Sequence, residues 1–254
     1  MRAPVDTLSA PTIPGGLEWV NVAGLRMDQQ LGRPVLVEFW DFCRVNSLRT
    51  LPYVRAWHEH YAAAGLRVIS AHAGGYPPSQ DPAEVRAAVE RLGVEHPVVI
   101  DADFQLWREY GNEAWPARYL FDQKLKLHSM HYGEGAYEET EREICELLAV
   151  PCEPLHPVRP EDSPGALLAA QTPEQQGAWS GPYEAGGVWA VLERTAPREA
   201  SPPIVSANGR EIAVAHSGCF ALVEHERHTA GELDLEVADG VICHAVQFTP
   251  GLAG

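Results

Sequence analysis

The chain has 254 residues, a length that exceeds one ordinary domain and accommodates two. Its 45% hydrophobic and 21% charged residues are typical of a folded globular protein, and no window approaches the roughly 20 apolar residues of a membrane span. The net charge of −16 would repel nucleic-acid phosphates and anionic lipid surfaces, so we expect neither as a partner.

The N-terminal segment and the cysteines indicate a cellular compartment. Residues 1–16 lack the apolar stretch and the small-residue cleavage pattern of a secretory signal. The cysteines are odd in number and scattered, a pattern that favours free thiols in a reducing compartment over a disulfide framework. They are Cys43, Cys145, Cys152, Cys219 and Cys243. We therefore expect a cytoplasmic protein.

The first part of the chain predicts alternating strands and helices, which indicates a layered α/β domain. Strands are expected at 34–40, 66–74 and 96–103, helices at 47–65, 81–94 and 104–112, a hairpin at 117–123 with 125–133, and a closing helix at 136–150. The apolar residues of the first helix recur every three or four positions. Asp81 and Pro82 have the residue types of an N-cap and a first helical position.

A proline-rich segment separates this part from a second one. Residues 151–165 contain five prolines, which neither a helix interior nor a central strand accepts. We therefore predict a domain over 1–150, a linker over 151–170 and a second domain over 171–254. In the second domain short strands are expected at 187–193, 210–216, 219–225, 231–238 and 241–248. Turn residues such as Asn208-Gly209 between them predict a small antiparallel β-sandwich.

Three segments carry a family resemblance. VEFWDFCRVNSLRTLPYV resembles the FW-x-x-x-C-x-x-C-x-R-T-L-P segment of the TlpA-like and DipZ-type thiol-disulfide oxidoreductases. NEAWPARYLFDQ and GEGAYEETEREICELL are similar to their N-x-x-WPA-x-YLID segment and closing helix. The resemblance implies a thioredoxin-like fold, a central mixed sheet flanked by helices. More loosely, TPEQQGAW and EVADGVICHAVQFTPG resemble the β-sandwich appended to DipZ-type proteins, which implies a module for a small ligand.

The redox motif of that family is missing from this sequence. Arg44 and Ser47 stand at the two positions that the resemblance gives to the redox cysteines, and no Cys-x-x-Cys occurs in the chain. Dithiol exchange needs one thiolate to attack and a second thiol to resolve the mixed disulfide. Whether the protein is an enzyme therefore stays open.

Cys43 is the one thiol near this segment, and two interpretations of it remain open. A helix N-terminus and Arg44 beside it would favour a reactive thiolate. Alternatively, Cys43 is a small buried hydrophobe, as free cysteines often are. A peroxidase is disfavoured because Trp40 occupies the position three residues earlier where a peroxiredoxin has threonine.

Glu38 and Trp115-Pro116 complete the candidate site. The resemblance aligns Glu38 with the buried acid behind the active site, so we expect a raised pKa or a partner such as Arg44 or a lysine. The resemblance also implies that Pro116 is the cis-proline facing the active-site loop. In relatives the backbone at Trp115 pairs with a bound peptide as an added strand does.

No cofactor or metal is predicted. The pairs His216/Cys219, His225/His228 and Cys243/His244 have spacings that would ligate one ion only across a turn. Trp179, Tyr183 and Trp189 are candidate stacking residues for a sugar, although core packing suits Trp189 better.

Two functions are compatible with the sequence. In the favoured one, a protein without dithiol cycling binds a protein or peptide partner in the cis-proline groove. In the alternative, a thiol-dependent oxidoreductase works through Cys43 with an external thiol such as glutathione.

Overall fold

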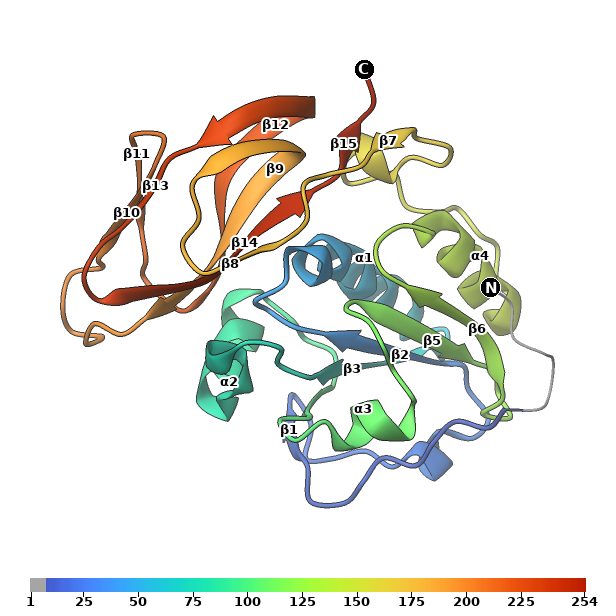
Figure 1. Ribbon diagram of the computed structural model, residues 1–254. Coiled ribbons are helices and arrows are strands. Elements are labelled where there is room, and N and C mark those ends of the chain that lie inside the picture. Colours follow the sequence, from blue (N-terminus) through green and yellow to red (C-terminus); the bar gives the residue numbers. More distant parts are fainter. Residues whose placement is uncertain (1–7) are drawn as a thin grey trace. The chain divides into compact units, whose positions relative to one another are not determined.

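The computed structural model describes residues 8–254 (Figure 1), so the first seven residues of the segment expected to lack a signal lie outside it. The chain forms two compact units. One comprises the chain up to Asp41 together with Asn46–His156, and the other comprises Phe42–Val45 together with Pro157–Gly254. Within residues 8–254, no helix has both the length and the apolar character that crossing a bilayer requires.

The first unit contains a six-stranded mixed sheet in the order β1-β4-β3-β2-β5-β6. The strands are β1 (Glu18–Val20), β2 (Val35–Trp40), β3 (Arg67–His72), β4 (Val98–Ile100), β5 (Ala117–Phe121) and β6 (Leu127–Tyr132). Neighbouring pairs among β2, β3 and β4 are parallel, and the other neighbouring pairs are antiparallel. Every residue of β2 is buried, as its apolar sequence predicts for a central strand covered on both faces.

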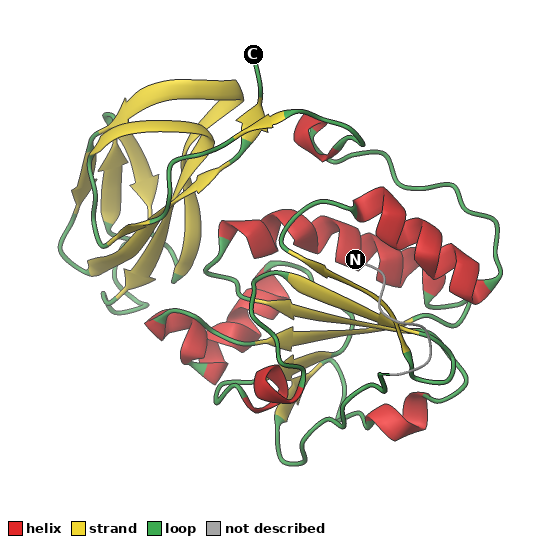
Figure 2. Ribbon diagram, turned by 45° about the vertical axis from the view of Figure 1, so that its right-hand side comes forward, coloured by secondary structure: helices red, strands yellow, loops and turns green. Residues whose placement is uncertain are grey.

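Helices lie on both sides of this sheet (Figure 2). They are α1 (Val45–Tyr61), α2 (Pro82–Arg91), α3 (Gln105–Glu109) and α4 (Tyr137–Leu148), with 3-10 turns at Met27–Gln30 and Pro77–Gln80. Residues of α1 and α4 pack on one face around Leu36, whereas α3 packs on the other around Val37 and Phe39. Successive side chains of a strand point to opposite faces of the sheet. Glu38 stands between Val37 and Phe39 and therefore lies on the face covered by α1 and α4.

The predicted elements of the first unit are confirmed, with shifted ends. Helix α1 begins at Val45, before the expected Ser47, and ends at Tyr61 because residues 62–65 form a turn. Asp81 caps α2, since its Oδ1 accepts a hydrogen bond from Ala83 N at 2.8 Å. Strand β1 was not expected from the sequence; its three residues pair with β4 at one edge of the sheet.

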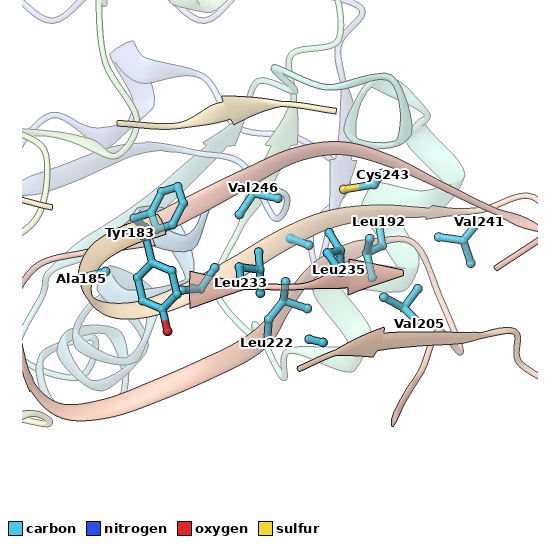
Figure 3. Close-up of a cluster of buried hydrophobic side chains, with 14 of the residues drawn as sticks. Tyr183, Ala185, Leu192, Val205, Leu222, Leu233, Leu235, Val241, Cys243 and Val246 are labelled. Carbon is cyan, nitrogen blue, oxygen red and sulfur yellow. The ribbon is translucent and has the colours of Figure 1, made fainter. Parts of the chain in front are cut away.

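The second unit is built from antiparallel strands. They are β7 (Leu168–Ala169), β8 (Gln175–Gln176), β9 (Gly181–Arg194), β10 (Ile204–Ala207), β11 (Arg210–Ala213), β12 (Gly218–Leu233), β13 (Leu235–Val237), β14 (Val241–Thr249) and β15 (Gly251–Leu252), with a 3-10 turn at Pro160–Asp162. The sheets β12-β9-β14-β8 and β11-β10-β13 share one buried apolar core (Figure 3). A two-stranded sheet, β15-β7, accompanies them.

The turn expected between two strands of this unit was wrong. The expected strand 219–225 lies within the long strand β12, which runs on to Leu233, and the expected strand 231–238 is divided between the end of β12 and β13. The pairing of β12 with β9 shifts register between Glu224 and Thr229. Such an irregularity interrupts the alternation from which a strand is predicted, so the sequence resembles two strands with a turn between them. The Asn208-Gly209 hairpin is confirmed, and both residues have positive φ, but its first strand, β10, was not expected.

Candidate functional site

Ser47 lies in the first turn of α1, where the resemblance would place a resolving cysteine. Its side chain is fully buried, and its Oγ accepts a hydrogen bond from Asp41 N at 3.2 Å. Asp41 itself accepts a hydrogen bond from Gly75 N through Oδ2 at 2.8 Å. The Ser47 hydroxyl therefore holds the turn between β2 and α1.

The loop Phe42–Val45 belongs to the second unit, where Gln247 of β14 binds its backbone. Gln247 Oε1 accepts from Val45 N at 2.9 Å, and Gln247 Nε2 donates to Cys43 O at 3.3 Å. Because the first N–H groups of a helix lack helical acceptors, Gln247 satisfies one of them. Gln247 was missed by the sequence analysis; its signal was an amide within the otherwise apolar stretch of β14.

The structure buries Cys43 and places Arg44 beside a carboxylate of the second unit. The side chain of Cys43 is 0% exposed, as expected for a small buried hydrophobe. Arg44 Nη1 lies 3.7 Å from Glu174 Oε2, so its charge is partly neutralised by that carboxylate. The structure therefore favours the buried interpretation of Cys43 over the reactive one.

Trp115-Pro116 adjoins the end of β2. The peptide bond between these residues is cis, as the resemblance implies. The register pairs Phe39 with Ala117, which brings the preceding Pro116 beside Trp40. Trp115 Nε1 donates to Ala73 O at 2.8 Å, and the Trp115 ring packs on Trp107 with ring centroids 4.2 Å apart. This half-buried aromatic surface borders the cis peptide.

The ring of Trp40 packs against His72, the last residue of β3, with ring centroids 5.1 Å apart and nearly perpendicular planes. His72 Nε2 lies 3.9 Å from Asp41 Oδ1. Burial lowers the pKa of His72 to about 3, so the imidazole is neutral at pH 7 and this contact is not an ion pair.

Glu38 is buried between two neighbouring strands that supply its partners. The sheet register pairs it with Ser70 on β3 and with Arg118 on β5. Ser70 Oγ donates to Glu38 Oε2 at 2.8 Å and lies 2.7 Å from His96 Nε2. Burial raises the pKa of Glu38 to about 7, against the opposing effects of the Ser70 hydrogen bond and the Arg118 charge. Of the two alternatives expected from the sequence, the structure favours the raised pKa, and the charged residue that acts on Glu38 is Arg118 and not Arg44 or a lysine.

Arg118 is a buried cation with aromatic neighbours. Its guanidinium carbon lies 5.6 Å from the ring centroid of Trp57 and 5.0 Å from that of Tyr137, and Nη2 donates to Gly135 O. Cation–π contacts of this kind offset part of the cost of removing the charge from water. Burial lowers the pKa of Arg118, while the charges of Tyr137 and Glu38 oppose this. Glu38 and Arg118 therefore link the sheet to α1 and α4.

The remaining candidates in the second unit have structural contacts. Tyr183 is buried in the core, and its hydroxyl lies 3.0 Å from His225 Nε2. Trp179 packs edge-on against Phe248, with ring centroids 5.7 Å apart. His244 Nε2 lies 2.6 Å from Glu193 Oε2. Among residues 8–254, no three His, Cys, Asp or Glu side chains are grouped so that they could hold a metal ion.

The buried Glu38 predicts a pH dependence of stability. The pKa of Glu38 is about 7 in the folded chain against an ordinary 4.5, so between these values the unfolded chain loses a proton that the folded chain retains. The contribution of Glu38 to stability is therefore largest below pH 4.5 and declines as the pH rises to about 7. We expect the free energy of unfolding of wild type, minus that of Glu38→Gln, to fall by about 3 kcal/mol over this range in urea titrations.

The variant Glu109→Gln, which replaces an exposed glutamate of α3, controls for the exchange of glutamate for glutamine. A Glu38→Gln difference that does not change with pH would mean that Glu38 ionises normally in the fold.

The comparisons with known proteins agree with this geometry. No protein-family model matches the chain. The chain is 31% identical to DipZ of Mycobacterium tuberculosis over 173 residues, which covers 65% of this chain and 25% of DipZ. It is 25% identical to the thiol-disulfide oxidoreductase YkuV of Bacillus subtilis over 140 residues, which covers 55% of this chain and 93% of YkuV.

The chain thus spans about a quarter of the length of DipZ. Among solved structures, a thioredoxin-like protein in the oxidized form superposes with a TM-score of 0.51 at 24% identity, covering 56% of this chain and 95% of that one. At this identity the superposition establishes the fold. Together these findings show that the chain is homologous to the thioredoxin-like thiol-disulfide oxidoreductases of the DipZ and ResA kind, with an additional C-terminal region of antiparallel β-sheets.

Proposed function

We propose that this chain is a thioredoxin-like protein that does not cycle a Cys-x-x-Cys dithiol and acts by binding an extended peptide or protein segment beside Trp115-Pro116. The observation that carries the proposal is the buried Ser47 at the start of α1, whose hydroxyl accepts the Asp41 N–H. A serine in this place cannot resolve a mixed disulfide, because resolution requires a second thiolate.

The other thiol near this place does not substitute for the missing pair. Cys43 precedes α1, but its side chain is fully buried, which keeps the thiol away from a substrate disulfide. The single-cysteine oxidoreductase working through Cys43 with glutathione is therefore the less favoured function, and the experiments below include it as an outcome.

The binding part of the proposal is supported by features that need no cysteine. The cis peptide at Trp115-Pro116 and the aromatic rings of Trp107 and Phe104 near Trp115 form a fixed surface at the end of the central strands. Extended peptides bind such surfaces through main-chain hydrogen bonds, with side chains occupying neighbouring pockets. The net charge of −16 favours a partner segment that is neutral or basic.

Restoring both cysteines tests the placement of the missing motif. In a Cys43→Ser background, the pair Arg44→Cys and Ser47→Cys should oxidise with glutathione disulfide, because residues three apart at a helix N-terminus lie on the same side of the helix. Peptide mapping by mass spectrometry should find the bond between positions 44 and 47. The control variant, which carries Cys43→Ser and Arg44→Cys but keeps Ser47, should give no such bond. If the folded variant with both new cysteines also forms no bond, positions 44 and 47 are not those of the missing redox motif.

Titration with a thiol-free peptide tests the binding surface. Insulin B chain whose thiols are capped with uncharged carboxamidomethyl groups, a probe that cannot exchange disulfides, should shift the amide NMR signals of residues 73–75, Trp115 and Ala117 in the labelled chain. The same shifts should occur in Cys43→Ser, because the proposed binding does not use the thiol. Absence of shifts, or shifts confined to residues 157–254, would refute binding beside Trp115-Pro116. Shifts lost in Cys43→Ser would instead favour the single-cysteine function.

A further inference from the structure

Two of the five cysteines lie together, far from the start of α1 in the sequence. Cys145 is buried on α4, and the chain reverses after this helix at Ala149, which has a φ of 54°. Cys152 then returns alongside α4, where its Sγ donates to Glu141 O at 3.8 Å. In an α-helix the carbonyl of residue 141 points at the N–H of residue 145, so the Cys152 thiol lies beside the backbone of Cys145.

A buried carboxylate holds this arrangement in place. Glu141 is 1% exposed; its Oε1 accepts from the Tyr61 hydroxyl at 2.7 Å, and its Oε2 accepts from Leu155 N at 2.9 Å. Cys145 Sγ donates in turn to the Tyr61 hydroxyl at 3.5 Å. One side chain of α4 thus fixes both the returning segment and the hydroxyl that contacts the first thiol.

Both thiols contact the surroundings of Glu141, since Cys152 Sγ donates to Glu141 O and Cys145 Sγ donates to the Tyr61 hydroxyl that is bound to Glu141 Oε1. Burial raises the pKa of Cys152 to about 12. Cys152 is partly exposed, whereas Cys145 is buried, so a small reagent reaches Cys152 first. For a disulfide to form, rotation of the two side chains must bring the sulfur atoms to the bonding distance of about 2.05 Å.

We propose that Cys145 and Cys152 are a second redox site, a dithiol that a small disulfide such as glutathione disulfide oxidises to an intramolecular disulfide. The bond would fasten the segment Val150–Leu155 to α4. This site is separate from the start of α1 and does not depend on the function proposed above.

The oxidation balances as two thiol–disulfide exchanges. The Cys152 thiolate attacks one sulfur of glutathione disulfide, forming a mixed disulfide and releasing one glutathione thiolate. The Cys145 thiolate then attacks the Cys152 sulfur and displaces the second glutathione. Two electrons pass from the protein to glutathione disulfide, and the two protons of the cysteines end on the two glutathione thiols.

Cys243 supplies a matched control from the second unit. It is also buried, and its Sγ donates to oxygen atoms, Gly177 O at 3.5 Å and Ala245 O at 3.6 Å. Burial raises its pKa to about 11, so it shares the low thiolate population of Cys152. A difference in oxidation between Cys152 and Cys243 reflects both the greater exposure of Cys152 and the neighbouring thiol of Cys145, and the variant Cys145→Ala separates these two effects.

The experiment oxidises the folded, reduced chain with glutathione disulfide at about pH 8.5, where the small thiolate fraction is larger than at neutral pH. After acid quenching, alkylation in denaturant should count three free thiols instead of five, with a mass decrease of about 2 Da. Peptide mapping should locate the bond between Cys145 and Cys152. Cys243→Ser should form the same bond, whereas Cys145→Ala should stop at a glutathione adduct on Cys152.

Five free thiols after prolonged oxidation of the folded wild type would overturn the proposal. So would a stable glutathione adduct on Cys152 in wild type, since Cys145 would then be out of reach. A bond that forms only in denaturant would also overturn it. The wild-type result does not depend on whether Cys145→Ala folds.

Discussion

A carboxylate in the middle of the central strand constrains the first unit more than any other group. Burying an ionised Glu38 would cost several kcal/mol, so the fold must either keep it protonated or compensate its charge. Burial raises the pKa of Glu38 to about 7, which favours the protonated form. When Glu38 is ionised, its charge is compensated by the hydrogen bond from Ser70 and by Arg118, which stands opposite it on the adjacent strand β5. Arg118 in turn needs the rings of Trp57 and Tyr137. One buried acid therefore links β2, β3 and β5 to helices α1 and α4.

This arrangement persists without the thiol that such an acid would serve. The resemblance implies that this acid lies behind a pair of redox cysteines. In this sequence Arg44 and Ser47 stand at the positions of those two cysteines. In this chain the surroundings of Glu38 are a hydrogen bond from Ser70 and the charge of Arg118, which stands opposite it in the sheet register. The cis peptide at Trp115-Pro116 is likewise present in this chain, and the peptide binding that we propose there needs no thiol. The buried acid and the cis peptide thus occur here together with a sequence that has no Cys-x-x-Cys.

Local signals were sufficient to predict most of the first unit. The apolar run of β2, the Asp81 cap and the periodic apolar face of α1 are each encoded within a few adjacent residues. Trp115-Pro116 was identified through a resemblance, since an X-Pro bond is cis only about one time in twenty on base rates.

The parts that escaped prediction depend on contacts between residues distant in sequence. Arg118 stands opposite Glu38 because of the register between β2 and β5. The sequence of one strand does not specify its register with another strand. Gln247 accepts a hydrogen bond from a backbone N–H 202 residues earlier, and nothing near Gln247 in the sequence identifies that donor. The neighbouring thiols of Cys145 and Cys152 depend on a chain reversal at Ala149, a non-glycine residue with positive φ.

The central claim is that this thioredoxin-like chain does not turn over disulfides through a dithiol at the start of α1. The reduction of insulin by dithiothreitol, followed by turbidity, tests it most directly. We predict that neither the wild-type chain nor the Cys43→Ser variant raises the rate of insulin reduction above the uncatalysed value. Reduction clearly above the uncatalysed rate that persists in Cys43→Ser would contradict the claim.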